Sequence, residues 1–311
     1  MENVAFVFPG QGSQAVGMLA DLAQEHDVVA QTFAEASQVL GYDLWALVKD
    51  GPVESLNETD KTQPALLTAS VAIWRAYQAS GKAMPAYLAG HSLGEYSALV
   101  CAGVMQFTDA VKLVELRGQL MQQAVPAGTG AMFAIIGLDD AAIATACEAS
   151  AQGDVVSPVN YNSPGQVVIA GEKNAVERAA AACKAAGAKM AVALPVSVPS
   201  HCALMKPAAD KLAQALADIS FSTPIINVIN NVDVAMPTLG EEIKDALVRQ
   251  LYCPVRWSDT VNYMAEKGVT ELVEMGPGKV LTGLTKRINK SVSAQAVNDV
   301  ASFASFAALT E

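Results

Sequence analysis

The sequence predicts an α/β protein with a mainly parallel sheet and a small inserted subdomain, and three observations predict this. Short apolar runs, typical of buried strands, alternate with helical patterns along most of the 311 residues. Between residues 128 and 197 the order becomes β-α-β-β-α-β, which is that of a ferredoxin-like module. Proline and glycine concentrate at residues 126–130 and 195–199, where this module would join the rest of the chain.

The part before the module contains two short strands and several helices. Residues 4–8 are an apolar run that ends at Pro9-Gly10, so we predict a buried strand there. Residues 86–89 are the next such run and lead into a turn at Ser92. Helical periodicity predicts helices at residues 28–40, 64–79, 94–102 and 108–123. Because strands connected by helices pair in parallel, both faces of this sheet should be covered.

The module and the part after it complete the prediction. Module strands are expected at residues 131–138, 155–161, 166–170 and 189–196, and module helices at residues 139–149 and 174–186. Alternation then resumes, with strands at residues 225–229 and 270–275 and helices at residues 241–252 and 258–267. We therefore predict a main catalytic domain of residues 1–127 and 198–311, and a small subdomain of residues 128–197.

Composition excludes several classes of function. The formal net charge is −11, so nothing supplies the basic face that nucleic acids or anionic membranes need. No apolar run approaches the roughly 20 residues of a membrane span. The five cysteines are scattered and never stand in Cys-x-x-Cys spacing, which favours free thiols over disulfides or a metal site. We expect a cytoplasmic monomer.

The stretch LAGHSLGEYSALV, residues 88–100, carries the strongest chemical signal. A strand, then Gly-x-Ser-x-Gly, then a helix is the pattern of a nucleophile elbow, in which glycines permit a tight turn that projects the hydroxyl of Ser92. The pattern is also common by chance, and a turn serine that caps the helix is the alternative. The strand before the turn and the helix after it favour the nucleophile.

A nucleophilic serine needs an imidazole within hydrogen-bond reach, and the chain has three histidines. His91 adjoins Ser92, and neighbouring side chains at an elbow point apart. His26 lies in a polar stretch typical of a surface. His201 follows Val198-Pro199-Ser200, where the inserted subdomain rejoins the main domain, and pockets favour such junctions. His201 is therefore the predicted base, with an ordinary loop histidine as the alternative.

An oxyanion hole needs two N–H donors, which we assign to Leu93, after the nucleophile, and to Gln11, in the loop after the first strand. Two other motifs fail. The loop Gly10-Gln11-Gly12 lacks the third glycine of a dinucleotide fingerprint at position 15. The stretch Gly276-Pro277-Gly278-Lys279 lacks both the leading glycine and the final hydroxyl of a phosphate loop.

Five motifs in order along nearly the whole chain resemble one family: FVFPGQGSQ, AGHSLGEYSAL, VELRGQLMQ, PVSVPSH and EMGPGKVLTGL. The chain resembles the bacterial malonyl-CoA:acyl carrier protein transacylases, which charge carrier protein for fatty-acid elongation. The resemblance implies an α/β-hydrolase-like core with a ferredoxin-like subdomain, and malonyl transfer from coenzyme A to the phosphopantetheine of the partner protein, with no resident cofactor.

The resemblance also assigns roles to residues. Ser92 would carry the malonyl group as an ester, and His201 would act first as base and then as acid. Arg117 would hold the free carboxylate of the malonyl group, a task for which a guanidinium is suited because it binds carboxylate through two parallel bonds. A main-chain carbonyl, placed at Gln250, would orient the histidine in place of an acidic side chain.

The carrier proteins of this pathway are acidic, so docking on an acidic enzyme requires a local basic patch. The densest basic run comprises Lys279, Lys286, Arg287 and Lys290, which Lys189 of the subdomain could join. A solvated helix face explains the run equally well. Three other functions stay open: an esterase that uses water, a non-catalytic scaffold subunit, and a relative that loads methylmalonyl or another extender unit.

Overall fold

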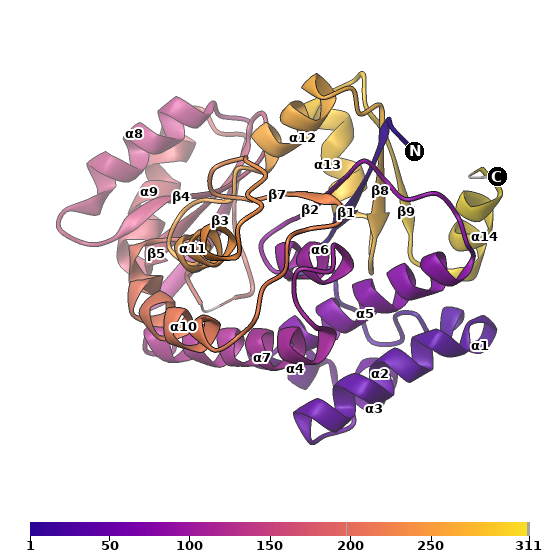
Figure 1. The fold of residues 1–311 in the computed structure, drawn as a ribbon. Coiled ribbons are helices and arrows are strands. Elements are labelled where there is room, and N and C mark those ends of the chain that lie inside the picture. The colour runs from indigo at the N-terminus through magenta and orange to yellow at the C-terminus, as the bar shows by residue number, and fades with distance from the viewer. Residues whose placement is uncertain (197, 310–311) are drawn as a thin grey trace.

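The computed structural model describes residues 1–196 and 198–309 and confirms the predicted fold class. A mostly buried parallel sheet, sheet A, forms the centre of the larger part, and a smaller antiparallel sheet, sheet B, lies beside it (Figure 1). Both chain termini lie on the side of sheet A away from sheet B (Figure 1). None of the helices described is long and apolar enough to cross a membrane.

Sheet A has five parallel strands in the order β7-β2-β1-β8-β9. Their bounds are β1 Val4–Phe8, β2 Tyr87–Gly90, β7 Asn227–Ile229, β8 Glu271–Met275 and β9 Ser293–Val297. Because the strands are parallel, the loops after β1, β2, β7 and β8 all leave the sheet at one edge. Ligands bind outside this carboxyl edge in open α/β sheets, so the edge is where a site is expected.

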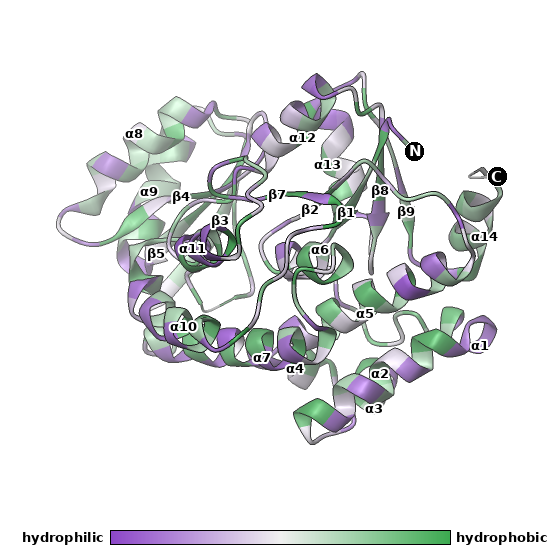
Figure 2. Cartoon of the chain, in the orientation of Figure 1, coloured by the Kyte–Doolittle hydropathy of each residue, from purple (hydrophilic) through white to green (hydrophobic). Residues whose placement is uncertain are grey.

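The two faces of sheet A are covered by different helices. Phe6 and Phe8 of β1 face one core, while Ala5 and Val7 face the other, as the alternation of strand side chains requires. Into the first core pack α1 Leu22–Glu25, α2 Asp27–Leu40, α3 Leu44–Asp50, α4 Val53–Leu56, α5 Thr59–Ala79, α6 Gly94–Cys101, α7 Phe107–Ala124, α10 Lys206–Ala217, α11 Gly240–Gln250 and α14 Val300–Leu309. Into the second pack α12 Trp257–Glu266 and α13 Val280–Ile288. Helices such as α2 and α10 carry both hydrophobic and hydrophilic residues, whereas α6 and α14 are mostly hydrophobic (Figure 2).

Sheet B is antiparallel, with strand order β4-β5-β3-β6. Its elements are β3 Gly130–Ile136, α8 Asp140–Ala151, β4 Val156–Ser163, β5 Gln166–Glu172, α9 Lys173–Ala185 and β6 Met190–Ala193. The first strand lies between the third and the fourth, as in a ferredoxin-like module, and α8 and α9 pack on one face. The domain boundaries stay a prediction, and residue 197 lies outside the described residues.

Several elements differ from the sequence prediction. Helix α5 begins at Thr59 rather than at Pro64, because the burial of most of its residues outweighs the roughly 3 kcal/mol that a proline inside a helix costs. The last strand of the module ends at Ala193, three residues early. Helices α1, α3, α4, α10 and α14 and strand β9 were not predicted. In β9 the sequence SAQAV is short and half exposed, so it carries no buried run.

The turn between β2 and α6 is tight enough to exclude side chains on both sides of Ser92. A Cβ atom on Gly90 would overlap the backbone of Gly94, and one on Gly94 would overlap the carbonyl of Phe8 at the end of β1. Ser92 itself has a φ of 52°, in the left-handed region that non-glycine residues rarely adopt. The close approach of helix to strand therefore fixes where the serine side chain points.

We predict that Gly94→Ala destabilises the fold by about 3 kcal/mol, because a backbone cannot yield to the added methyl group without shifting the helix. The matched control is Gly283→Ala in the middle of α13, where an added Cβ meets nothing within 4 Å. That variant should gain up to about 1 kcal/mol from helix propensity. Urea denaturation of both variants measures the difference, and equal stabilities would contradict this account of the turn.

Candidate active site

The structure brings Ser92 and His201 together from segments 109 residues apart. The Oγ of Ser92 lies 2.8 Å from Nε2 of His201. On its other side, the ring bonds through Nδ1 to the main-chain carbonyl oxygen of Gln250 at 2.6 Å. A carbonyl only accepts, so Nδ1 carries the proton and Nε2 is left as the acceptor for the serine hydroxyl.

His201 is held as a neutral imidazole. It is buried, and its backbone adopts a φ of 64° while its N–H bonds to the carbonyl of Leu251 at 2.9 Å. Burial, together with the nearby charge of Arg117, lowers the pKa of His201 to about 3, against the hydrogen bond to Gln250. The ring is therefore available as a base at any pH well above 3.

Arg117 of α7 lies in the same site and is 1% exposed. Its guanidinium donates to the side-chain oxygen of Gln63 at 2.8 Å and to that of Gln250 at 3.0 Å, and its NH2 group lies 3.4 Å from Oγ of Ser92. The Nε atom has no partner in the part of the chain that is described. Burial lowers the pKa of Arg117.

The guanidinium of Arg117 is surrounded by neutral hydrogen-bond partners rather than by a paired carboxylate. Among the described residues none lies within ion-pair distance of its guanidinium, whose hydrogen-bond acceptors are all neutral. Burying a cation without an ion pair is expensive, so this guanidinium is suited to binding an anion. The guanidinium carbon of Arg117 also lies over the ring of Tyr96, 5.3 Å from its centre, which adds a weak cation–π attraction.

Ser92, His201 and Arg117 line one pocket between the carboxyl edge of sheet A and sheet B. The other walls are mainly apolar and come from the turn after β2, from α7, from β3 and from the connection after β6: Leu93, Met121, Met132, Leu194, Val196 and Val198. The pocket therefore lies at the junction of the two parts, as the position of His201 in the sequence predicts.

The backbone of two residues offers hydrogen-bond donors to this pocket. Gln11 and Leu93 both line it, and within the described chain neither backbone N–H has an acceptor. Gln11 lies in the loop after β1, and Leu93 follows Ser92 directly at the start of α6. Two free donors beside a nucleophile are what an oxyanion hole requires.

The sequence analysis missed the side chains of Asn231 and Gln250, which hold Ser92 and Arg117 in position through hydrogen bonds. Asn231 follows β7; its Oδ1 accepts the N–H of Ser92 at 2.7 Å, and its Nδ2 donates to the carbonyl of Gly90 at 2.6 Å. The side chain of Gln250 donates to the carbonyl of Ser92 at 3.0 Å, besides accepting from Arg117. The one available signal was the position of Asn231 just beyond the carboxyl end of a parallel strand.

The remaining histidines and the neighbouring cysteine have packing roles. His91 bonds to Oδ1 of Asn162 at 2.8 Å and packs on the ring of Trp257, and His26 packs on Phe303. Cys202 is buried, and burial raises the pKa of its thiol to about 11. No cluster of three or more His, Cys, Asp or Glu side chains suited to a metal ion occurs in residues 1–196 and 198–309.

Comparisons with known proteins show the family to which the chain belongs. The family model described as acyl transferase domain matches residues 5–306. A relative from Salmonella typhimurium named malonyl CoA-acyl carrier protein transacylase is 68% identical over 311 residues, all of both chains.

Two solved structures extend the likeness. An acyl carrier protein S-malonyltransferase from Vibrio cholerae is 72% identical with a TM-score of 0.97, over 98% of this chain and 99% of that one. A malonyl-transacylase solved in complex with a type II PKS acyl-carrier protein is 67% identical with a TM-score of 0.97, over 97% and 98% of the two chains. The chain therefore belongs to the family of malonyl CoA-acyl carrier protein transacylases within the acyl transferases.

Proposed function

We propose that this chain transfers the malonyl group of malonyl-CoA to the phosphopantetheine thiol of an acyl carrier protein, through an ester on Ser92, and so supplies fatty-acid elongation. The observation that carries the proposal is one pocket in which a serine lies 2.8 Å from a neutral histidine and beside a buried, unpaired arginine. The first pair suits acyl transfer, and the arginine suits an acyl group that ends in a carboxylate.

In the first half of the reaction the Oγ of Ser92 attacks the thioester carbonyl carbon while Nε2 of His201 takes the hydroxyl proton. The negative charge that forms on the carbonyl oxygen is stabilised by the backbone N–H groups of Gln11 and Leu93. When the tetrahedral intermediate collapses, the C–S bond breaks and His201 returns its proton to the sulfur. Coenzyme A leaves as a thiol, and malonyl remains as the Ser92 ester.

The second half runs in reverse with another thiol. His201 takes the proton of the phosphopantetheine thiol, the sulfur attacks the ester carbonyl, and the bond to Ser92 breaks as the serine regains a proton. The carbonyl of Gln250 keeps the imidazole in one tautomer throughout. A thioester is converted into an ester and back into a thioester, and this nearly balanced exchange asks for less stabilisation of the imidazolium than amide cleavage does.

The walls of the pocket support transfer rather than hydrolysis. Met132, Leu194, Val196 and Val198 present apolar surface around the serine, which disfavours water near the ester. The nucleophile, the base and the cation are all supplied by the chain, so we propose that no resident cofactor takes part. All five cysteines are free, which supports a reducing compartment such as the cytoplasm.

For the carrier protein we propose a docking patch on α13 and its flanks, composed of Lys279, Lys286, Arg287, Lys290 and Lys189. All five are exposed. Arg287 donates to the side chain of Gln166 at the start of β5 at 2.7 Å, and Lys189 packs over Gly137, whose N–H bonds to Gly165 next to Gln166. These contacts support a continuous basic area across both parts, against the negative charge of the whole chain.

Ser92→Ala should abolish covalent labelling by malonyl-CoA, because it removes the hydroxyl that bonds to Nε2 of His201 and is thereby activated. Intact-mass spectrometry after mixing with malonyl-CoA, acetyl-CoA or methylmalonyl-CoA measures the label and also ranks the acyl groups. A persistent malonyl adduct on the alanine variant would refute the assignment. Rapid loss of the wild-type adduct to water, without carrier protein, would favour an esterase.

Arg117→Ala should reduce kcat/KM for malonyl-CoA by about 30-fold, the equivalent of about 2 kcal/mol for charge-assisted hydrogen bonds, with little loss for acetyl-CoA. The expected readout is the ratio of the two specificity constants. The control is Arg75→Ala, which removes an arginine that pairs with Glu35 and packs on Phe107. Equal losses for both substrates would count against a carboxylate clamp.

Charge reversal at Lys286 and Arg287 should raise KM for the carrier protein about tenfold and leave self-acylation by malonyl-CoA unchanged, since rim charges act mainly on encounter. Lys211→Glu on α10 is the control, because this exposed lysine lies on a different helix. Steady-state kinetics with varied carrier protein at two salt concentrations test the patch. Unchanged kinetics would eliminate it.

A further inference from the structure

A buried carboxylate next to the site takes no part in the mechanism above. Glu95, the second residue of α6, is 2% exposed. One of its oxygens, Oε2, accepts the backbone N–H of Asn231 at 2.9 Å and the side-chain Nε2 of Gln250 at 2.8 Å. It forms no ion pair within the described residues. Burial of a carboxylate on two neutral donors requires an explanation.

The two partners of Glu95 are the residues that brace the reacting groups. Asn231 binds the N–H of Ser92 and the carbonyl of Gly90, so it holds the turn that projects the nucleophile. Gln250 binds His201 through its main chain, and Arg117 and Ser92 through its side chain. Ser92, His201 and Arg117 each therefore contact a residue that Glu95 binds.

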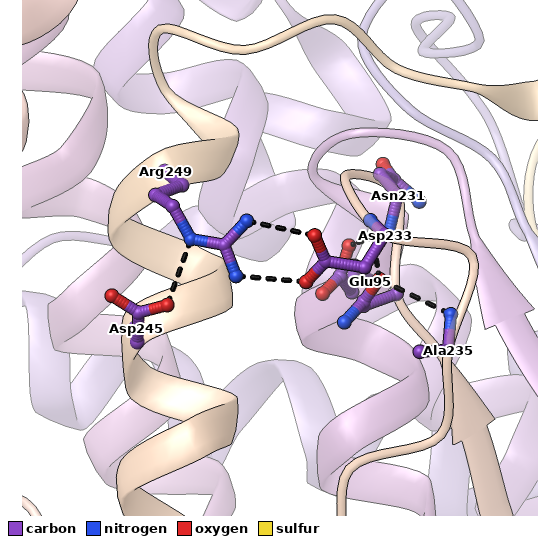
Figure 3. Close-up of polar contacts among 7 residues, drawn as sticks. Glu95, Asn231, Asp233, Ala235, Asp245 and Arg249 are labelled. Atoms are coloured by element: carbon purple, nitrogen blue, oxygen red, sulfur yellow. Dashed lines mark hydrogen bonds and ion pairs between the residues drawn. The ribbon is translucent and has the colours of Figure 1, made fainter.

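The segments that bear these two partners are also tied together at the surface. Asp233, in the loop after β7, receives two hydrogen bonds from the guanidinium of Arg249 at 2.7 and 2.9 Å, and Asp245 receives a third at 2.7 Å (Figure 3). Arg249 directly precedes Gln250 in α11. The loop is closed by a hydrogen bond from the N–H of Asn230 to the carbonyl of Ala235 at 2.9 Å. Together these contacts fix the position of the loop relative to the end of α11.

The same loop carries backbone strain. Val234 has a φ of 55°, a conformation that a β-branched residue rarely adopts and that costs about 1–3 kcal/mol. Such strain persists only where surrounding contacts hold the backbone in place. In this loop those contacts are the surface ion pair between Asp233 and Arg249 and the buried hydrogen bond from the N–H of Asn231 to Glu95. The loop is held so that Asn231 reaches the amide of Ser92.

We propose that Glu95 is a positioning residue for malonyl transfer: its carboxylate holds Asn231 and Gln250 where they orient Ser92, His201 and Arg117. The proposal rests on the proposed function. In most serine hydrolases a carboxylate binds the catalytic histidine directly. In this chain the carboxylate of Glu95 accepts a hydrogen bond from the side-chain amide of Gln250, and the main-chain carbonyl of Gln250 binds His201. Glu95 therefore acts through Gln250 and touches no reacting atom.

The charge of Glu95 supports a measurable pH dependence. Burial raises the pKa of Glu95 to about 7, against the hydrogen bonds from Asn231 and Gln250 and the charge of Arg117, while Asp233 raises it slightly. The phenol of Tyr96 also faces it, and burial keeps that group protonated. As pH rises through about 7, Glu95 becomes a carboxylate and a stronger acceptor. His201, with a pKa near 3, does not titrate there.

The test compares Glu95→Gln with Glu274→Gln. Glu274 is equally buried and accepts hydrogen bonds from Leu281 and Thr282 at the start of α13, outside the pocket, so its substitution imposes a similar structural loss. Single-turnover acylation by malonyl-CoA is measured between about pH 5 and pH 9, together with thermal denaturation. Labelling of Ser92 by phenylmethylsulfonyl fluoride measures its reactivity without any malonyl substrate.

We expect Glu95→Gln to lower the acylation rate by about 10- to 100-fold with little change in KM, and to lose the rise near pH 7 that the wild type shows. Sulfonyl fluoride labelling should slow as well. Glu274→Gln should keep the rate and the rise even where its Tm falls. Equal effects of the two variants would overturn the proposal, as would a wild-type profile with no rise near pH 7, a result that needs no variant.

Failure of the proposed function gives a different result. Suppose that the wild type forms no malonyl ester, that sulfonyl fluoride labels Ser92 quickly in the wild type, and that it labels Ser92 slowly in the Glu95→Gln variant. Malonyl transfer is then wrong, and the positioning role stands for another acyl group. If labelling is equally fast in both proteins, the positioning role is wrong.

Discussion

The hydrogen bond between Ser92 and His201 is the interaction on which the rest of the structure depends. It is 2.8 Å long and joins a turn of sheet A to a loop that follows sheet B. Keeping it requires a φ above zero at both residues, glycines on both sides of the serine, and a carbonyl that fixes the tautomer of the ring. The unusual backbone conformations at this edge of the sheet are thus explained by the contact between Ser92 and His201.

A second constraint is the charge of Arg117. Its guanidinium is buried and donates to the neutral side chains of Gln63 and Gln250, an arrangement that leaves it suited to binding an anion. The same charge helps to keep His201 neutral, since it lowers the pKa of the ring. One side chain thus lies beside the nucleophile and also lowers the pKa of the base.

The fold and the centre of the site could be predicted from sequence because their signals are local. The apolar run ended by Pro9-Gly10 and the Gly-x-Ser-x-Gly turn each lie within a few residues, and only three histidines had to be compared. The contacts of Asn231, Gln250 and Glu95 that hold the reacting groups in place could not be predicted. Asn231 and Glu95 meet across 136 residues, and nothing near either of them in sequence marks the contact. The accepting carbonyl of Gln250 came from family likeness alone.

The carbonyl of Gln250 has one further consequence, which concerns evolution rather than chemistry. A peptide oxygen belongs to the backbone, so no exchange of the side chain at position 250 deletes the acceptor that orients His201. In an enzyme with an acidic triad member, one nucleotide change can remove that group. Here the orienting group is immune to substitution, and mutation reaches it only by displacing the end of the helix.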